Sequence, residues 1–165
     1  AHHFKKTKNL QKLHCLLIAC SFTDRDMTHI APALGGLPNL VELNLERNWG
    51  LGGYAASWAH HLRKMKNLEK LQFNNQRFTG GDMTHIAPAL GGLPNLVELN
   101  LERNFGLGGS AASWAHHLRK MKNLQKLNYR WCSCTGGDMT HIAPALCDLP
   151  NLVELNIEGN KALGG

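Results

Sequence analysis

The sequence predicts an α/β fold in which parallel strands form one sheet and helices cover its outer side. Two observations lead to this prediction. The segment GGDMTHIAPAL occupies residues 80–90 and again 136–146, so the chain repeats itself with a 56-residue period. Each 56-residue module contains two 28-residue units, whose leading leucines are Leu40, Leu68, Leu96, Leu124 and Leu152. A fixed period of this length is typical of a stacked array and not of a globule.

Each unit is expected to begin with a strand. Leu40, Leu43, Leu45 and Asn48 fit the leucine-rich repeat pattern L-x-x-L-x-L-x-x-N/C, and the later units follow it. Leucines that alternate with polar residues are typical of a half-buried strand.

The first unit departs from this pattern, because it holds two extra residues ahead of Met27. Counting back from Met27 assigns Cys20 to the asparagine/cysteine position. It assigns Cys15 and Leu17 to the two core positions before it. The first strand is then expected to be either bulged or shifted in register.

The remainder of each unit predicts helices. In SAASWAHHLRKM, residues 110–121, Ser110 is the expected N-cap. Trp114, Leu118 and Met121 follow at helical spacing and form one buried stripe.

A second kind of helix is expected at DMTHIAPAL, residues 82–90, with Asp82 as its cap. Pro88 should shorten or kink this helix, because proline lacks an N–H and crowds the preceding turn. Strands lie about 4.8 Å apart and helices roughly 8–10 Å apart. The sheet is therefore expected on the concave side of a curve and the helices on the convex side.

A 28-residue period with one helix per unit resembles the ribonuclease-inhibitor class of leucine-rich repeats. The 56-residue module, with GGDMTHIAPAL and LGGSAASWAHHL, is similar to the sensor region of NOD-like innate immune receptors, especially the duplicated arrays of invertebrates. The resemblance covers the whole chain and implies ligand recognition on the concave sheet. We therefore expect a single leucine-rich repeat domain over residues 1–165, a right-handed horseshoe solenoid of about six repeats.

The two ends of the chain predict a longer array. The opening AHHFKKTKNL matches AHHLRKMKNL at residues 59–68, so it reads as the tail of a repeat helix. The closing LGG at 163–165 stops where earlier copies continue into a helix. Ends without a polar cap leave a strand edge open, which predicts weak self-association or a further domain there.

One short window separates two otherwise near-identical copies. Residues 28–71 and 84–127 differ at three of 44 positions, whereas 72–78 and 128–134 differ at all seven. The outward residues of that window are expected on the concave face, where Trp and Arg are enriched at binding hot spots. The alternative is neutral drift, with Trp131 packed on Arg103. The candidate ligand-binding residues are Trp131, Arg130, Asn128, Lys126, Arg103, Glu102, Asn75, Asn74, Gln72 and Arg47.

The rest of the predicted concave face reads as structural. The third strand position is expected to form a ladder of alternating charge, which supports the register: Glu42, Lys70, Glu98, Lys126 and Glu154. The fifth position forms an amide row: Asn44, Gln72, Asn100, Asn128 and Asn156. In the first unit the same face carries Leu16 and Ile18, an apolar patch that is either a partner site or a seam to a further unit.

Several function classes are not expected. Equivalent histidines recur only once per 56-residue module, too far apart to share a metal ion, so neither a metal nor a cofactor is predicted. No nucleophile–base or phosphate-loop motif occurs, so we expect a non-enzyme. The net charge is +6, and basic residues cluster on the predicted helices. A convex basic stripe could hold phosphates or acidic glycolipids, but no aromatic residues interleave with it for nucleic-acid stacking, so ordinary solvation of exposed helix faces is the favoured interpretation.

Cellular location is inferred from cysteines and hydropathy. Five cysteines without zinc spacing favour core thiols over disulfides, and hence a reducing, cytoplasmic compartment. No apolar run is long enough to span a membrane. Two functions remain open: a module that recognises a protein or microbial surface ligand, or a structural repeat array, even a consensus-like one, without a dedicated ligand.

Overall fold

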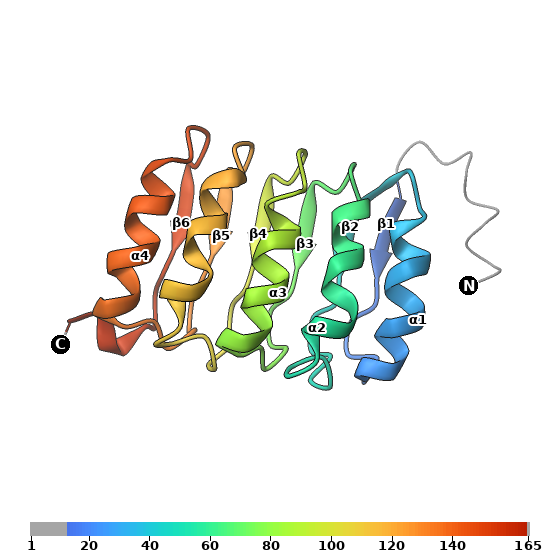
Figure 1. The fold of residues 1–165 in the computed structure, drawn as a ribbon, viewed down its shortest axis with the longest axis horizontal. Coiled ribbons are helices and arrows are strands. Elements are labelled where there is room, and N and C mark those ends of the chain that lie inside the picture. Colours follow the sequence, from blue (N-terminus) through green and yellow to red (C-terminus); the bar gives the residue numbers. More distant parts are fainter. Residues whose placement is uncertain (1–12, 165) are drawn as a thin grey trace.

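The computed structural model describes residues 13–164. Within them the chain forms one sheet of six parallel strands, arranged in the order of the sequence (Figure 1). The strands are β1 (Leu13–Leu16), β2 (Leu40–Asn44), β3 (Lys70–Gln72), β4 (Glu98–Asn100), β5 (Lys126–Asn128) and β6 (Glu154–Asn156). Paired residues are one 28-residue unit apart, as in Glu42 with Lys70 and Lys70 with Glu98. This confirms the predicted parallel sheet, in which corresponding residues lie side by side.

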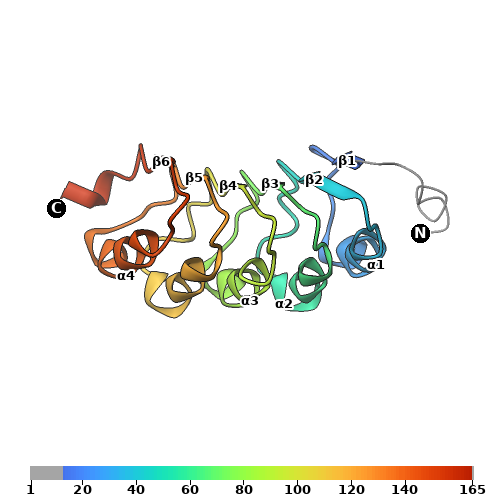
Figure 2. The ribbon, with the colours of Figure 1, turned by 90° about the horizontal axis from the view of Figure 1, so that it is seen from above.

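Helical segments connect the strands and cover one side of the sheet. They are α1 (Asp24–Gly35), α2 (Ala55–Trp58) with η2 (Ala59–Lys64), α3 (Gly80–Leu90), η3 (Ala111–Ser113) with η4 (Ala115–Lys120), α4 (Gly136–Cys147) and η5 (Lys161–Gly164). Figure 2 shows the helices on the outer side of a shallow arc and the strands on its concave side. The layer order is therefore the predicted one.

The start of α3 differs from the prediction. Its N-cap is Thr79, whose side chain accepts a hydrogen bond from the backbone N–H of Asp82. Asp82 in turn accepts from the Thr79 N–H at 2.8 Å, which completes a capping box. The same carboxylate also accepts the N–H groups of Gly53 and Ala55 from the preceding connection. Asp82 thus joins two consecutive connections as well as starting its own helix.

The other predicted helix details also need correction. Residues 110–121 are wound as two 3-10 segments, and no side-chain hydrogen bond from Ser110 caps them. The Ser110 hydroxyl instead donates to the Leu107 carbonyl and accepts from Nε1 of Trp114 at 3.1 Å. Pro88 does not end α3, which continues to Leu90. The proline lies in the last turn, so the helix is not shortened ahead of it.

The core is a continuous apolar layer between the sheet and the helices. The leading leucines Leu40, Leu68, Leu96 and Leu124 are fully buried. The equally buried Trp58 and Trp114 belong to the same core. Within the described residues, no helix combines the length and apolar character needed to cross a membrane.

A buried polar ladder follows the carboxyl ends of the strands. Its members stand at the asparagine/cysteine position of successive units: Asn48, Gln76, Asn104, Cys132 and Asn160. Asn104 donates to the carbonyls of Phe73 and Leu101, and its Oδ1 accepts from the N–H groups of Gln76 and Phe78. One side chain therefore satisfies the backbone of two neighbouring turns that would otherwise be buried without partners.

The first unit behaves as predicted in register but not in burial. The pairing of β1 with β2 shifts between Leu13 and His14 and then places Cys15 opposite Leu43. Cys15 is buried, whereas Cys20 is exposed and its thiol donates to the nearby Ile18 carbonyl at 3.5 Å. Cys20 is therefore not a core thiol. All five cysteines are free thiols, three of them buried.

Candidate recognition surface

The charge ladder predicted on the concave face is formed. Lys70 lies 3.9 Å from Glu98, and Lys126 lies 3.0 Å from Glu154. The hydrogen bond from Lys126 to Glu154 raises the pKa of that lysine. His14 extends the ladder through its Nδ1, 2.5 Å from Glu42. The lysines are half-exposed, so the pairs set register more than they add stability.

The amide row is formed as well and has a local task. The Oδ1 atoms of Asn44, Asn100, Asn128 and Asn156 each accept the N–H two residues ahead. Gln72 is the exception, since its amide donates to Glu98 at 2.9 Å. Four of the five members thus bend the chain at the end of a strand. With Lys126, Glu98 and Glu154, the last three asparagines border a shallow groove of about 140 Å³.

Arg130 lies at the centre of a charged cluster on this face. Its guanidinium is 3.2 Å from Glu158 and 4.0 Å from Glu102, one carboxylate on each neighbouring unit. Asn128 also donates to Glu102 at 3.2 Å. The Nε of Arg130 is buried without a hydrogen-bond partner. Four predicted residues are thus near one another: Arg130, Asn128 and Glu102 by contact, and Trp131 through Arg130.

Trp131 is half-buried by the chain itself. The Arg130 guanidinium lies 5.7 Å from the centre of its ring. A side chain at Gly159, where φ is +76°, would come within 2.6 Å of Trp131 Nε1. The indole therefore packs on Gly159 and lies beside Arg130. Its Nε1 has no hydrogen-bond partner.

The third residue after the end of each strand has its backbone in the left-handed region. This position is occupied by residues with φ between 52° and 76°: Ala19, Arg47, Asn75, Arg103, Trp131 and Gly159. The N–H groups of the first five bond to a carbonyl of the next unit at 2.8–3.2 Å. The stack thus imposes this backbone shape whatever the side chain, although the shape is strained for non-glycine residues.

Arg103 shares Glu102 with the Arg130 cluster, whereas Arg47 lies at another place on the face. Arg103 and Arg47 are half-exposed and pair with Glu102 and Glu46 beside them in sequence, at 3.6 and 3.3 Å. Asn74 carries a buried Oδ1 without a partner.

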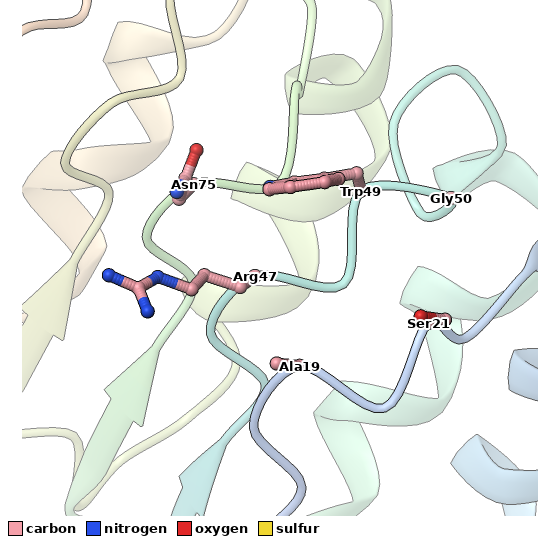
Figure 3. A pocket seen from close by; sticks show the side chains of 6 residues that line it. All are labelled: Ala19, Ser21, Arg47, Trp49, Gly50 and Asn75. Atoms are coloured by element: carbon pink, nitrogen blue, oxygen red, sulfur yellow. The ribbon is translucent and has the colours of Figure 1, made fainter.

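Arg47 and Asn75 belong to a pocket of about 610 Å³ at the carboxyl ends of the strands, and Figure 3 shows the side chains around it. The other residues that line it are Ala19, Ser21, Trp49 and Gly50. Sequence reasoning did not select these four residues. A difference in the sequence could have pointed to Trp49: it stands opposite Phe105 at one of the three positions where the long matching copies differ.

Among residues 13–164, His, Cys, Asp and Glu side chains nowhere gather in a group of three that could hold a metal ion. The stacked pairs His60–His61 and His116–His117 have ring centres 3.9 and 4.0 Å apart. Burial, then the neighbouring histidine and lysine, lower the pKa of His61 and His117. The lowered pKa favours the neutral imidazole at His61 and His117.

No family model matches the chain, and no curated protein sequence shows a significant match to it. Among solved structures, one described as leiomodin-1 actin-binding site 2 is similar, with a TM-score of 0.63 and 19% sequence identity. The match covers 88% of this chain and 83% of that chain. At this identity the likeness concerns the fold.

Proposed function

We propose that the chain is a leucine-rich repeat solenoid of the ribonuclease-inhibitor class whose concave face binds a protein or microbial surface ligand. It performs no catalysis in this proposal. The immune-receptor resemblance suggests a cytoplasmic pattern-recognition role, and the five free thiols agree with a reducing compartment.

The observation that carries the proposal is the Arg130–Trp131 pair. It replaces Asn74–Asn75 in one of two otherwise near-identical copies. Arg130 lies between two carboxylates on the concave face with its side chain 34% exposed, and Trp131 beside it is half-buried. Arginine and tryptophan side chains that are held in place by their neighbours and keep some exposed surface are favourable anchors for a partner.

The test exchanges these residues for those of the sister strand. Arg130→Asn with Trp131→Asn copies Asn74–Asn75, and Asn75 already adopts a φ of 62° at the same position, so folding should be retained. The full chain is immobilised and probed with peptidoglycan fragments, lipopolysaccharide and candidate proteins. We expect the exchange to weaken binding by more than about tenfold, as at other hot spots.

The matched control lies on the helical side. Lys64→Glu and Lys120→Glu should leave binding unchanged if the concave face carries it. Binding that follows these lysines and falls steeply with salt would instead support a polyanion ligand on the convex stripe. If no probe distinguishes the native chain from the exchanged variant, the structural-array alternative is favoured.

A further inference from the structure

The pocket beyond the carboxyl ends of β1, β2 and β3 has the size of a small-molecule site. Its volume of about 610 Å³ falls within the roughly 300–1,000 Å³ common for such sites. It opens where the chain leaves β1, β2 and β3, and the Trp49 indole lies across it (Figure 3). It is separate from the Arg130 cluster and does not depend on the proposed function.

Two of the residues that line the pocket are small. Ala19 and Ser21 stand at positions that carry Asn75 and Arg77 one 56-residue module later. All four residues have φ between 52° and 62°, so the backbone is alike and the side chains decide how much space remains. The module repeat thus supplies a natural comparison for the open pocket.

The chemistry of the lining favours a ring and a negative charge. Trp49 is 53% exposed, a high value for the largest apolar side chain. Arg77 lies over its ring with Cζ 5.3 Å from the centre. Arg47 contributes a second guanidinium that is 54% exposed and whose Nε pairs with Glu46 at 3.3 Å. None of the six lining residues is acidic, and Asn75 adds an amide.

We propose that this pocket binds a small planar ring that carries an anionic group. The ring stacks on the indole of Trp49, since every planar π-system offers a face for such stacking. The anion takes the guanidinium of Arg47, which can hold a carboxylate or phosphate with two parallel hydrogen bonds. The small Ala19 and Ser21 leave room for the ring.

The test uses the full chain and adenosine 5′-monophosphate as the probe, with calorimetry as the measurement. Adenosine and ribose 5-phosphate supply the ring and the anion separately. The intact probe should bind about tenfold or more tighter than either fragment, because both contacts are then made together. A second probe, 2-naphthoate, replaces phosphate by carboxylate. Binding of either intact probe supports the proposal, and binding of neither at millimolar concentration overturns it.

Two sets of variants locate the binding. Trp49→Ala and Arg47→Ala should each weaken it by about tenfold, the usual scale for a stacking or charged contact. Ala19→Asn with Ser21→Arg copies the next module into the pocket and should abolish binding while the melting temperature stays unchanged. Equal binding by this folded, closed variant overturns the proposal.

A spectroscopic readout separates binding here from binding elsewhere. The chain has four tryptophans, and Trp49→Phe, which copies Phe105, identifies the indole N–H signal of Trp49 by its loss. Titration with the probe should shift that signal and leave those of Trp114 and Trp131 in place. Shifts confined to the other tryptophans contradict the proposal.

Discussion

The regions around β3 and β5 share one hydrogen-bonded backbone frame, but different side chains pack beneath the two strands. Beneath β3, the rings of Trp58, Phe73 and Phe78 form an all-aromatic group with centres 5.4–6.0 Å apart. Beneath β5, the ring of Trp114 contacts that of Tyr129, 5.9 Å away, and Cys134 takes the third place. The first filling is larger and apolar, and the second is smaller and carries polar atoms.

The polar atoms show how the two fillings are compensated. Trp58 Nε1 is buried without a partner, whereas Trp114 Nε1 reaches the hydroxyl of Ser110, which stands where the earlier copy has Tyr54. In return, the hydroxyl of Tyr129 is buried and unpartnered. The copies therefore differ in where an unsatisfied group lies and in the winding of residues 55–58 against 111–113, and they agree in strand register. The same hydrogen-bonded backbone thus accommodates different core side chains.

The largest effect is expected in the aromatic group. Phe73→Ala removes a fully buried ring between two others and should lower the free energy of unfolding by about 3–5 kcal/mol. Urea denaturation measures it. Phe78→Cys, which copies Cys134, should cost less, because the chain already packs a thiol at that place. A smaller loss for Phe73→Ala than for Phe78→Cys would mean that the group is not packed as a unit.

A loss of about 1.5–3 kcal/mol, typical of hydrogen bonds to a charged group, is expected from Asp138→Asn. Its carboxylate accepts the N–H groups of Gly109, Ala111 and Thr135. Asp82→Asn is the matched variant, since Asp82 makes the same set of bonds one module earlier. Similar losses by thermal denaturation would show that the frame is equally strong in both copies, and unequal losses would show that the filling alters it.

The same carboxylate predicts a dependence on pH. Burial alone would raise the pKa of Asp138, but hydrogen bonds from Ala111, Gly109 and Thr135 outweigh it and lower the pKa. The unfolded chain then binds the proton more readily, so this stability is complete above the unfolded pKa of about 3.9. It is lost as the pH falls through the lowered folded value. The difference in stability between native chain and Asp138→Asn should shrink accordingly under acid.

The smallest effect, and the only gain, is expected from Tyr129→Phe. Burial raises the pKa of Tyr129 far above its usual range, and its hydroxyl has no partner. Removing that hydroxyl relieves an uncompensated desolvation, so the variant should be more stable by about 1 kcal/mol. Phe73→Tyr is the reverse exchange and should destabilise the chain. Unfolding curves that show a loss for Tyr129→Phe would indicate that a water satisfies the hydroxyl.

The sequence predicted those parts of the fold that follow from its period. Leucines at the 28-residue period fix which strand residues are neighbours, so the charge ladder and the amide row followed directly. The β1 shift was predicted because counting back from Met27 left two residues over. The 3-10 winding of 111–120 was not, since its apolar spacing is equally compatible with an α-helix.

The candidate site was less predictable because its contacts join side chains of different units. That Trp131 packs on Gly159 depends on a glycine in the next unit, at a position where the earlier module has Arg103. The pocket at Trp49 depends on Ala19 and Ser21 from a unit with irregular spacing. The sequence shows that these residues are present, but which of them lie close together follows only once the register between units is known.

The left-handed position beyond each strand has a consequence for how such a surface can change. Backbone hydrogen bonds to the next unit hold its shape, and alanine, arginine, asparagine, tryptophan and glycine all occupy it in this one chain. A substitution there changes the side chain on the surface and leaves unchanged the leucines and backbone hydrogen bonds that determine the fold of the unit. Duplication of a unit followed by substitution at this position can therefore change the binding surface while the fold stays the same.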